Sequence, residues 1–251
     1  MNGDAQIHSA DRDNPIWERT RIVVGDEGVS RLRAARVLLA GLGGVGSYAA
    51  EALARAGIGR LTLADFDLVA PSNLNRQLVA LGSTLGKKKL EVMGERVRDI
   101  NPDCRLTLLD RFLPADEMAP VLVPGYDYVV DAIDSLNSKI ALIAAARALD
   151  ISVASSMGAG GRTDPSQLRL GDVMDSRGCP LARVVRQRLR RRGVDRGVLA
   201  VWSEEQPCAP LPPVSTDRGR PRAINGTVSY LPALFGMMLA GAVIHRLIGR
   251  V

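Results

Sequence analysis

The chain has 251 residues, of which 46% are hydrophobic, so it is long enough to bury one sizeable core or two small ones. Its 33 basic and 27 acidic residues leave a net charge of +6, which permits an anionic partner without requiring one. The cysteines, Cys104, Cys179 and Cys208, lie far apart and form no CxxC pair, which excludes a disulfide framework and a four-cysteine zinc site within the chain. We therefore expect a globular protein of the cytoplasm.

The beginning of the chain is polar and carries acidic residues early, without the basic and apolar segments of a secretory signal. We expect residues 1–18 to form a disordered leader and residues 19–251 to form one domain. Within that domain, the nucleotide-binding core is expected at about residues 35–160, with substrate-facing and dimer elements at about 161–251.

Short apolar runs bounded by turn signals alternate with helical patterns over the first 156 residues. The expected strands are 36–40, 60–65, 105–110, 126–134 and 151–156, and the expected helices are about 45–56, 87–100 and 138–149. This alternation predicts an α/β fold, with a doubly wound, Rossmann-like, mostly parallel sheet covered by helices on both faces. After Gly161 we expect a loop with a short strand, an arginine-dense helix and a proline-rich stretch at 206–222.

An apolar segment at 228–244 follows the proline-rich stretch. It is shorter than the roughly 20 residues that span a membrane, and it contains Pro232, Gly236 and Gly241. These features favour a helix that is buried or faces a dimer partner, while membrane contact stays open as the alternative.

A glycine-rich turn, GLGGVGS at 41–47, comes directly after the first expected strand and opens the first helix. In a GxGxxG motif the first glycine allows a tight turn, the second lets the backbone approach a phosphate, and the third allows close helix packing. An acid, Asp65, follows Gly46 by 19 residues at the end of the next strand, where a carboxylate can accept hydrogen bonds from ribose hydroxyls. The sequence therefore predicts nucleotide binding by Gly41, Gly43, Gly44, Gly46 and Asp65, the alternative being a turn needed only for packing.

Residues further along the chain indicate which nucleotide is bound. Asn73, Arg76 and Lys89 form a polar and basic set that serves a dehydrogenase little, because nicotinamide dinucleotide has no third phosphate, whereas attack on the α-phosphate of ATP develops charge that cations stabilise. Asp134, expected to close the strand 126–134, could hold Mg²⁺ against the phosphates or cap the following helix. The two histidines, at positions 8 and 245, are poorly placed as hydride-transfer acids.

Four motifs occur in order: GxGGxGS at 41–47, DxDxVxxSNLxRQ at 65–77, GxxKxE at 86–91 and DxxD at 131–134. Together they resemble the ubiquitin-activating-like superfamily, which includes MoeB and ThiF. The resemblance implies that Asp65 binds ribose, that Asn73, Arg76 and Lys89 contact the triphosphate, and that Asp134 binds Mg²⁺. It also implies adenylation of a carboxylate with release of pyrophosphate, by a homodimer.

MoeB and ThiF typically carry two zinc-binding CxxC pairs, which this chain lacks. Segments 19–32, 98–104, 131–143, 158–172 and 180–194 resemble instead the TcdA (CsdL) family, the tRNA threonylcarbamoyladenosine dehydratases. The resemblance implies ATP-dependent cyclisation of threonylcarbamoyladenosine in tRNA, with ATP and Mg²⁺ as cofactors. It further allows a sulfur-transfer or cysteine desulfurase partner.

The arginine-dense helix fits a tRNA substrate. Apolar residues recur at helical spacing in it, so one stripe can pack while the arginines face outward. Seven arginines fall within 14 positions: Arg183, Arg186, Arg188, Arg190, Arg191, Arg192 and Arg196. We expect Arg186, Arg190, Arg191 and Arg192 to bind tRNA phosphates, the alternative being an ordinary solvated helix.

The implied reaction needs no protein nucleophile, because the attacking group belongs to the substrate. The candidate catalytic residues are therefore those that position and stabilise charge, Arg76, Lys89 and Asp134. Two other functions stay open from the sequence: adenylation of the C-terminal glycine of a ubiquitin-like sulfur-carrier protein, and a nucleotide-binding module without catalysis.

Overall fold

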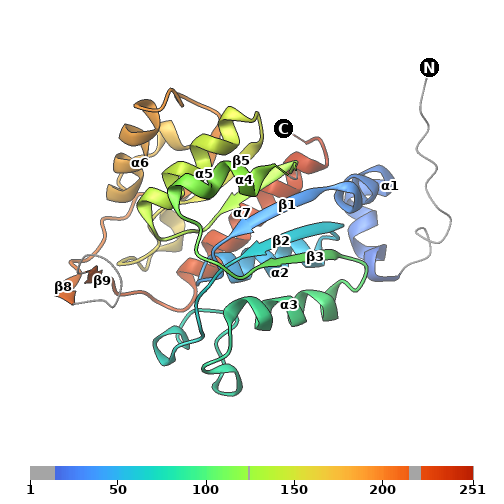
Figure 1. The fold of residues 1–251 in the computed structure, drawn as a ribbon, viewed down its shortest axis with the longest axis horizontal. Coiled ribbons are helices and arrows are strands. Elements are labelled where there is room, and N and C mark those ends of the chain that lie inside the picture. Colours follow the sequence, from blue (N-terminus) through green and yellow to red (C-terminus); the bar gives the residue numbers. More distant parts are fainter. Residues whose placement is uncertain (1–14, 124, 215–221, 251) are drawn as a thin grey trace.

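A computed structural model describes residues 15–123, 125–214 and 222–250. Its centre is a seven-stranded sheet in the order β3-β2-β1-β4-β5-β7-β6. Strands β1, β2 and β3 of this sheet are labelled side by side in Figure 1. Neighbouring strands are parallel except for β6, which runs antiparallel to β7. The strands of this sheet are β1 (Arg36–Ala40), β2 (Arg60–Ala64), β3 (Arg105–Leu109), β4 (Tyr128–Asp131), β5 (Ser152–Ser156), β6 (Leu168–Asp172) and β7 (Val198–Ser203). The expected doubly wound α/β fold is confirmed.

Helices cover both faces of the sheet (Figure 1). The helices are α1 (Glu18–Ala34), α2 (Gly46–Arg55), α3 (Lys89–Ile100), α4 (Met118–Leu122), α5 (Leu136–Ala148), α6 (Pro180–Arg190) and α7 (Leu231–Leu247). One apolar core lies between the sheet and α2, α3 and α7, and the other lies between the sheet and α4, α5 and α6.

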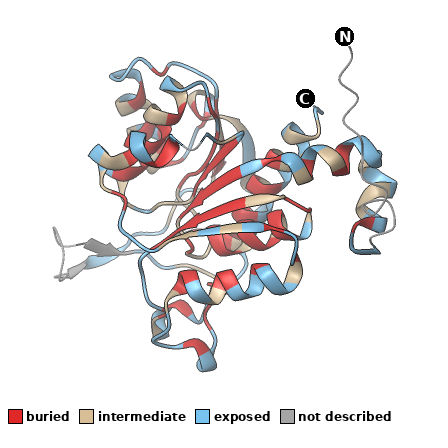
Figure 2. Cartoon of the chain, turned by 45° about the vertical axis from the view of Figure 1, so that its right-hand side comes forward, coloured by how far each residue is buried: buried red, intermediate tan, exposed pale blue. Residues whose placement is uncertain are grey.

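Strand β1 shows how the sequence builds two cores at once. Val37 and Leu39 belong to the α2 side, while Leu38 and Ala40 belong to the α5 side, because successive side chains of a strand point to opposite faces. All four are buried, as expected for a central parallel strand covered on both sides, and the sheet is largely buried through its middle (Figure 2).

The ends of the central strands are in register along the carboxyl edge of the sheet. Ala40 of β1 pairs with Ala64 of β2 on one side and with Asp131 of β4 on the other, and Asp131 pairs with Ser155 of β5. The turns that follow these strands therefore meet at one edge, where ligands of open α/β sheets bind.

Two expected boundaries need correction. Strand β4 ends at Asp131, so Asp134 lies three residues beyond the strand, in the turn before α5. The expected leader reaches into the fold, because Pro15–Trp17 form a 3-10 helix and α1 begins at Glu18. Trp17 is 2% exposed, and its ring lies directly beside Gly57. The rest of the leader, residues 1–14, lies outside the described residues.

A second, two-stranded sheet is made of β8 (Leu211–Val214), within the proline-rich stretch, and β9 (Arg222–Ile224), which begins at its last residue; this sheet projects from the body in Figure 1. The apolar segment after it forms α7, which packs on α2 and on β5 and β7. Phe235, Leu239 and Val243 of α7 are fully buried, which confirms the expectation of a buried helix. Among the described residues, no helix has both the length and the apolar character needed to cross a membrane.

Candidate active site

A cavity of about 770 Å³ lies at the carboxyl edge of the sheet. The residues expected to hold a nucleotide line its wall: Gly41, Gly43, Gly44, Asp65, Asn73, Arg76, Lys89 and Asp134. The remaining predicted residue, Gly46, does not line it. Side chains that are far apart in the sequence are thus gathered in one place.

The glycines of the turn have two different roles: some line the cavity, and others allow close packing of the backbone. Gly41 has φ of 94°, a conformation that glycine adopts readily, and a Cβ there would lie 2.6 Å from the carbonyl oxygen of Ala132. A Cβ on Gly46 would lie 1.7 Å from the carbonyl oxygen of Gly41, so α2 can start this close to the turn only without a side chain. Gly46 therefore serves packing, whereas Gly43 and Gly44 expose backbone to the cavity.

Asp65 sits at the end of β2 beside this turn. Its Oδ2 accepts a hydrogen bond from the amide of Leu42 at 2.5 Å, and its Oδ1 accepts one from the amide of Asp67 at 2.8 Å. Burial raises the pKa of Asp65, while these amide hydrogen bonds and the charge of Lys89 act in the opposite direction. The carboxylate is fixed in place by two amides and keeps further lone pairs for hydroxyl donors.

Two aromatic rings border the same end of the cavity and were not found from the sequence. Phe66 follows Asp65, and Phe112 comes from the loop after β3; their centroids are 5.3 Å apart in an edge-to-face arrangement. Both are partly exposed, at 42% and 45%. Exposed aromatic rings beside a candidate ribose-binding acid offer an apolar surface to a flat base.

The predicted cations differ in how they are held. Lys89 is buried at the start of α3, and its Nζ lies 2.8 Å from Oδ2 of Asp67, whose side chain is 50% exposed. Arg76 donates from Nη1 to the carbonyl oxygen of Ser72 and to Oδ1 of Asn75, and it makes no ion pair with any described residue. Partial burial lowers the pKa of Arg76, because its charged form loses solvation.

Asn73 lines the same cavity and is buried, with its Oδ1 accepting a hydrogen bond from the amide of Ala70 at 3.1 Å. Its side-chain oxygen therefore fixes the turn that carries Arg76. The amide group of the side chain remains the part that could donate to a phosphate.

Asp134 is exposed at the cavity wall. The residue at the N-cap of α5 is Ser135, whose own side chain forms no capping hydrogen bond. Among the described residues no group of three or more His, Cys, Asp or Glu side chains could hold a metal ion. One carboxylate fits Mg²⁺ only if phosphate oxygens and waters complete the coordination, which is the usual way this ion is bound beside a nucleotide.

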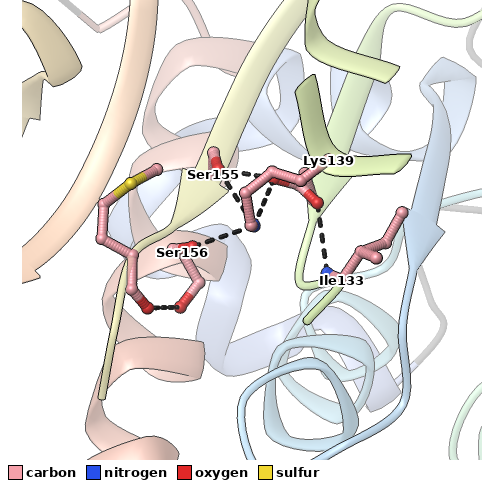
Figure 3. Close-up of polar contacts among 6 residues, drawn as sticks. Ile133, Lys139, Ser155 and Ser156 are labelled. Atoms are coloured by element: carbon pink, nitrogen blue, oxygen red, sulfur yellow. Dashed lines mark hydrogen bonds and ion pairs between the residues drawn. The ribbon is translucent and has the colours of Figure 1, made fainter. Parts of the chain in front are cut away.

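A buried ionic network connects β4 with Lys139 of α5 and with Ser155 and Ser156 of β5 (Figure 3). Nζ of Lys139 lies 2.6 Å from Oδ2 of Asp131 and donates to the carbonyl oxygen of Ser156 at 3.0 Å. The Ser155 hydroxyl donates to the same carboxylate oxygen at 2.5 Å, and Oδ1 of Asp131 accepts from the amide of Ile133 at 3.1 Å. Lys139 and Asp131 are 1% and 0% exposed, so the network ties β4, β5 and α5 together and fixes the backbone next to Asp134.

The arginine-dense helix, α6, starts at the cavity and runs away from it. Cys179, Pro180 and Leu181 line the cavity, while Arg190 lies at the other end of the helix, about 15 Å away at the α-helical rise. Arg190, Arg191 and Arg192 are exposed. A polyanion that inserts one group into the cavity could therefore also contact these three side chains.

Arg186 departs from the expected outward orientation. It is only partly exposed, and its Nη1 donates to the carbonyl oxygen of Ser176 at 2.7 Å and to the hydroxyl of the same residue. Ser176 precedes α6 and is buried. Arg186 therefore helps to fix the segment before the helix through Nη1, and its expected contact with phosphate stays a prediction.

The chain is similar in sequence and in fold to known proteins, and it matches the ThiF family over residues 18–251. It is 37% identical to a tRNA threonylcarbamoyladenosine dehydratase of Bacillus subtilis, over 92% of this chain and 94% of that protein. Among solved structures, it is similar to one described as TcdA (CsdL), with a TM-score of 0.85 and 37% identity over 95% and 96% of the two chains. The structure of Escherichia coli TcdA in complex with ATP gives a TM-score of 0.82 and 36% identity, over 94% and 96%.

Proposed function

This chain belongs to the ThiF family, and we propose that it is an ATP-dependent tRNA threonylcarbamoyladenosine dehydratase. The observation behind the proposal is that the glycine turn, Asp65, Arg76, Lys89 and Asp134 line one cavity. The chain also matches an enzyme of this name along more than nine-tenths of its length. A relative of this name has been solved with ATP bound, which supports ATP as the cosubstrate.

In the proposed first step, ATP lies with its ribose at Asp65 and its phosphates over Gly43 and Gly44. A carboxylate oxygen of the threonyl group attacks the α-phosphorus, and the bond from that phosphorus to the bridging oxygen of pyrophosphate breaks. Arg76 and Lys89 stabilise the charge that develops on the phosphates. Lys89 can do so because its partner, Asp67, is half exposed and can be left to solvent.

In the second step, a nucleophilic atom of the same modified nucleoside attacks the activated carbonyl carbon. The bond from this carbon to the oxygen of AMP breaks, the ring closes, a proton is released, and the carboxylate oxygen leaves with AMP. The substrate has thereby lost one water. The protein's contribution is to hold the two reacting groups together, so the reaction needs no attack by a side chain of the protein.

We assign the Mg²⁺ that accompanies ATP to Asp134. This carboxylate is exposed at the cavity wall, and the buried Asp131–Lys139 pair fixes the turn that carries it. The ion would supply neutralisation of phosphate charge when bound. Asp134 positions it.

We further propose that the tRNA lies across residues 161–251, with its modified base in the cavity and its backbone along α6. The exposed Arg190, Arg191 and Arg192 support this placement, because they offer positive charge at about 15 Å from the cavity. A tRNA substrate supports the cytoplasm as the compartment of the protein. No observation on the described residues points to a sulfur-transfer or cysteine desulfurase partner, and that partner stays a prediction from the resemblance.

We also propose a homodimer. Four apolar side chains are left exposed on helices that contact each other, namely Ile22 and Val23 of α1 and Leu234 and Met237 of α7. Light scattering of the protein during gel filtration tests this assembly, and a monomer at micromolar concentration would contradict it.

The decisive experiment incubates the purified protein with ATP, Mg²⁺ and tRNA that carries threonylcarbamoyladenosine. Mass spectrometry of the digested nucleosides should show loss of one water and equimolar formation of AMP. An unchanged nucleoside would refute the proposed function. A parallel reaction offers a ubiquitin-like protein ending in Gly-Gly and should show no pyrophosphate exchange, since adenylation of such a protein is not favoured by the relatives that match the whole chain.

A further inference from the structure

Arg162 is a buried cation in the wall of the cavity, and the nucleotide does not account for it. Its side chain is 3% exposed; Nε donates to the carbonyl oxygen of Glu205 at 2.8 Å, and Nη1 donates to those of Gly158 and Gly160 at 2.6 and 3.2 Å. Nη2 is buried and has no hydrogen-bond partner, and no carboxylate forms an ion pair with the guanidinium, among the residues that the structure describes. Buried charges in proteins are normally paired with an opposite charge, and the guanidinium of Arg162 departs from this rule among the described residues.

Helix α6 adds a second positive element at the same place. A Cβ on Gly158 would lie 3.5 Å from Nη1 of Arg162, 3.6 Å from Sγ of Cys179 and 3.7 Å from Cβ of Leu181, so the guanidinium and the start of α6 converge there. The first amides of a helix have no partner within the helix, and its N-terminus carries partial positive charge. Cys179 at the N-cap forms no side-chain capping bond. The guanidinium and the helix end thus both favour a negatively charged group at this place.

The position of Arg162 along the sheet separates it from the nucleotide. Asp65 follows β2, the glycine turn follows β1, and the Gly158–Arg162 segment follows β5, which lies beyond β4 on the other side of the turn. Neighbouring strands are about 4.8 Å apart, so β5 lies about 10 Å from β1. A nucleotide with its ribose at Asp65 and its phosphates over the glycine turn leaves this part of the cavity to the second substrate.

We propose that Arg162, with the N-terminus of α6, forms the site that binds the carboxylate of the substrate before it is adenylated. The inference rests on the proposed function, which supplies the carboxylate. A guanidinium suits this group because its donors match a carboxylate in geometry as well as in charge. Arg162 then distinguishes a nucleoside that carries the threonyl carboxylate from an unmodified adenosine at the same place in tRNA.

The test measures the dissociation constants of two tRNAs without ATP, one carrying threonylcarbamoyladenosine and one carrying adenosine at that position. The wild-type protein should prefer the modified tRNA, and Arg162→Met should reduce this preference by about tenfold to a hundredfold, the usual effect of removing a charge-assisted hydrogen bond. The affinity for ATP should stay within about twofold of wild type, since the phosphates lie elsewhere. Arg169→Met is the matched control, because Arg169 lies outside the cavity and pairs with Glu204 on the surface.

An unchanged preference in Arg162→Met would overturn the inference, as would an equal loss of ATP affinity, which would assign the charge to the phosphates. A purely structural role would lower both tRNA affinities together and leave their ratio intact, which also contradicts it. If Arg162→Met does not fold, Arg162→Lys is measured in the same way and should give a smaller loss of preference. A wild-type protein that fails to dehydrate modified tRNA refutes the proposed function; an active one whose Arg162 variants keep the preference refutes this inference alone.

Discussion

The two ends of the cavity hold their positive charges in different ways. At the β2 end, Lys89 is paired with a half-exposed Asp67, and Arg76 contacts only neutral oxygen atoms of described residues. At the β5 end, Lys139 lies outside the cavity lining and forms a fully buried pair with Asp131, while the buried Arg162 forms no ion pair with a described acid. The cations at the first end can exchange their partners for phosphate easily. At the second end, Lys139 fixes the backbone, and Arg162 is the residue that we propose to bind the substrate carboxylate.

The largest expected effect comes from breaking the buried pair. Lys139→Met leaves Asp131 buried without a counter-charge, which should lower the free energy of unfolding by about 3–5 kcal/mol. Urea denaturation measures this change. Lys88→Met, which removes a half-exposed surface cation, is the control and should leave the unfolding transition almost unchanged. The double variant Lys139→Met, Asp131→Leu should recover much of the loss, and a Lys139→Met protein as stable as wild type would contradict the structural role.

The second prediction concerns the exchangeable cations. Arg76→Ala and Lys89→Ala should each lower kcat for dehydration by about 10²–10³, the usual effect of removing a group that stabilises developing charge. Neither should lower stability much, because Arg76 is partly exposed and the partner of Lys89 is half exposed. Lys87→Ala is the control, since Lys87 is exposed and does not line the cavity. Reduced steady-state rates with near-normal unfolding curves would support a catalytic role for Arg76 and Lys89. Normal rates in both variants would contradict that role.

The third prediction compares the exposed arginines at the end of α6 with Arg186, which is hydrogen-bonded to Ser176. Replacing Arg190, Arg191 and Arg192 with Ala should flatten the plot of log affinity for tRNA against log salt by about 0.9 for each phosphate that is no longer neutralised. Arg186→Ala should leave this slope unchanged and lower thermal stability instead, because Arg186 binds Ser176. Filter binding over a range of salt concentrations measures both slopes. Equal slopes for the triple variant and wild type would remove α6 from the tRNA interface.

The same contrast explains what the sequence could reveal about the site. The glycine turn, the start of α2 and Asp65 lie close together in the chain. Glycines at the spacing GxGxxG after a strand are a specific signal of nucleotide binding, so the β2 end of the cavity was predictable from local sequence pattern. Most of the strands were predictable for the same reason, because each apolar run is bounded by turn residues. Strand β4 was expected to run to Asp134, since apolar Ile133 continues the pattern, but the pairing of β4 with β5 ends at Asp131.

The β5 end was not predictable, because its contacts join distant elements. Lys139 stands out as a charge in an apolar helix, yet only the pairing of β4 with β5 brings Asp131 and Ser155 to it. Arg162 carries no sequence sign of burial, since its partners are carbonyl oxygens. Helical periodicity placed Arg186 outward, but the partner that turns it inward lies in the loop before the helix.

The smallest expected effect is the response of the β2 end to pH, and it has a clear sign. Burial raises the pKa of Asp65, so this carboxylate takes up a proton at a higher pH than an ordinary aspartate. If Asp65 accepts hydrogen bonds from the ribose hydroxyls as proposed, protonation removes that acceptor, and the affinity for adenosine should fall by up to about tenfold as the pH drops through that pKa. The fold responds in the opposite direction, because a raised pKa in the folded state means that protonation of Asp65 favours folding.

Adenosine is the right probe for this measurement, because it has no phosphate that titrates in the same range, and 2′,3′-dideoxyadenosine is its matched control. Calorimetry should show a pH-dependent affinity for adenosine and a nearly constant one for the dideoxy compound. Asp65→Asn should weaken adenosine binding and flatten its pH dependence, since the amide does not titrate. If both compounds lose affinity together, the acid acts on the fold of the turn through its hydrogen bonds to Leu42 and Asp67 rather than on the ribose.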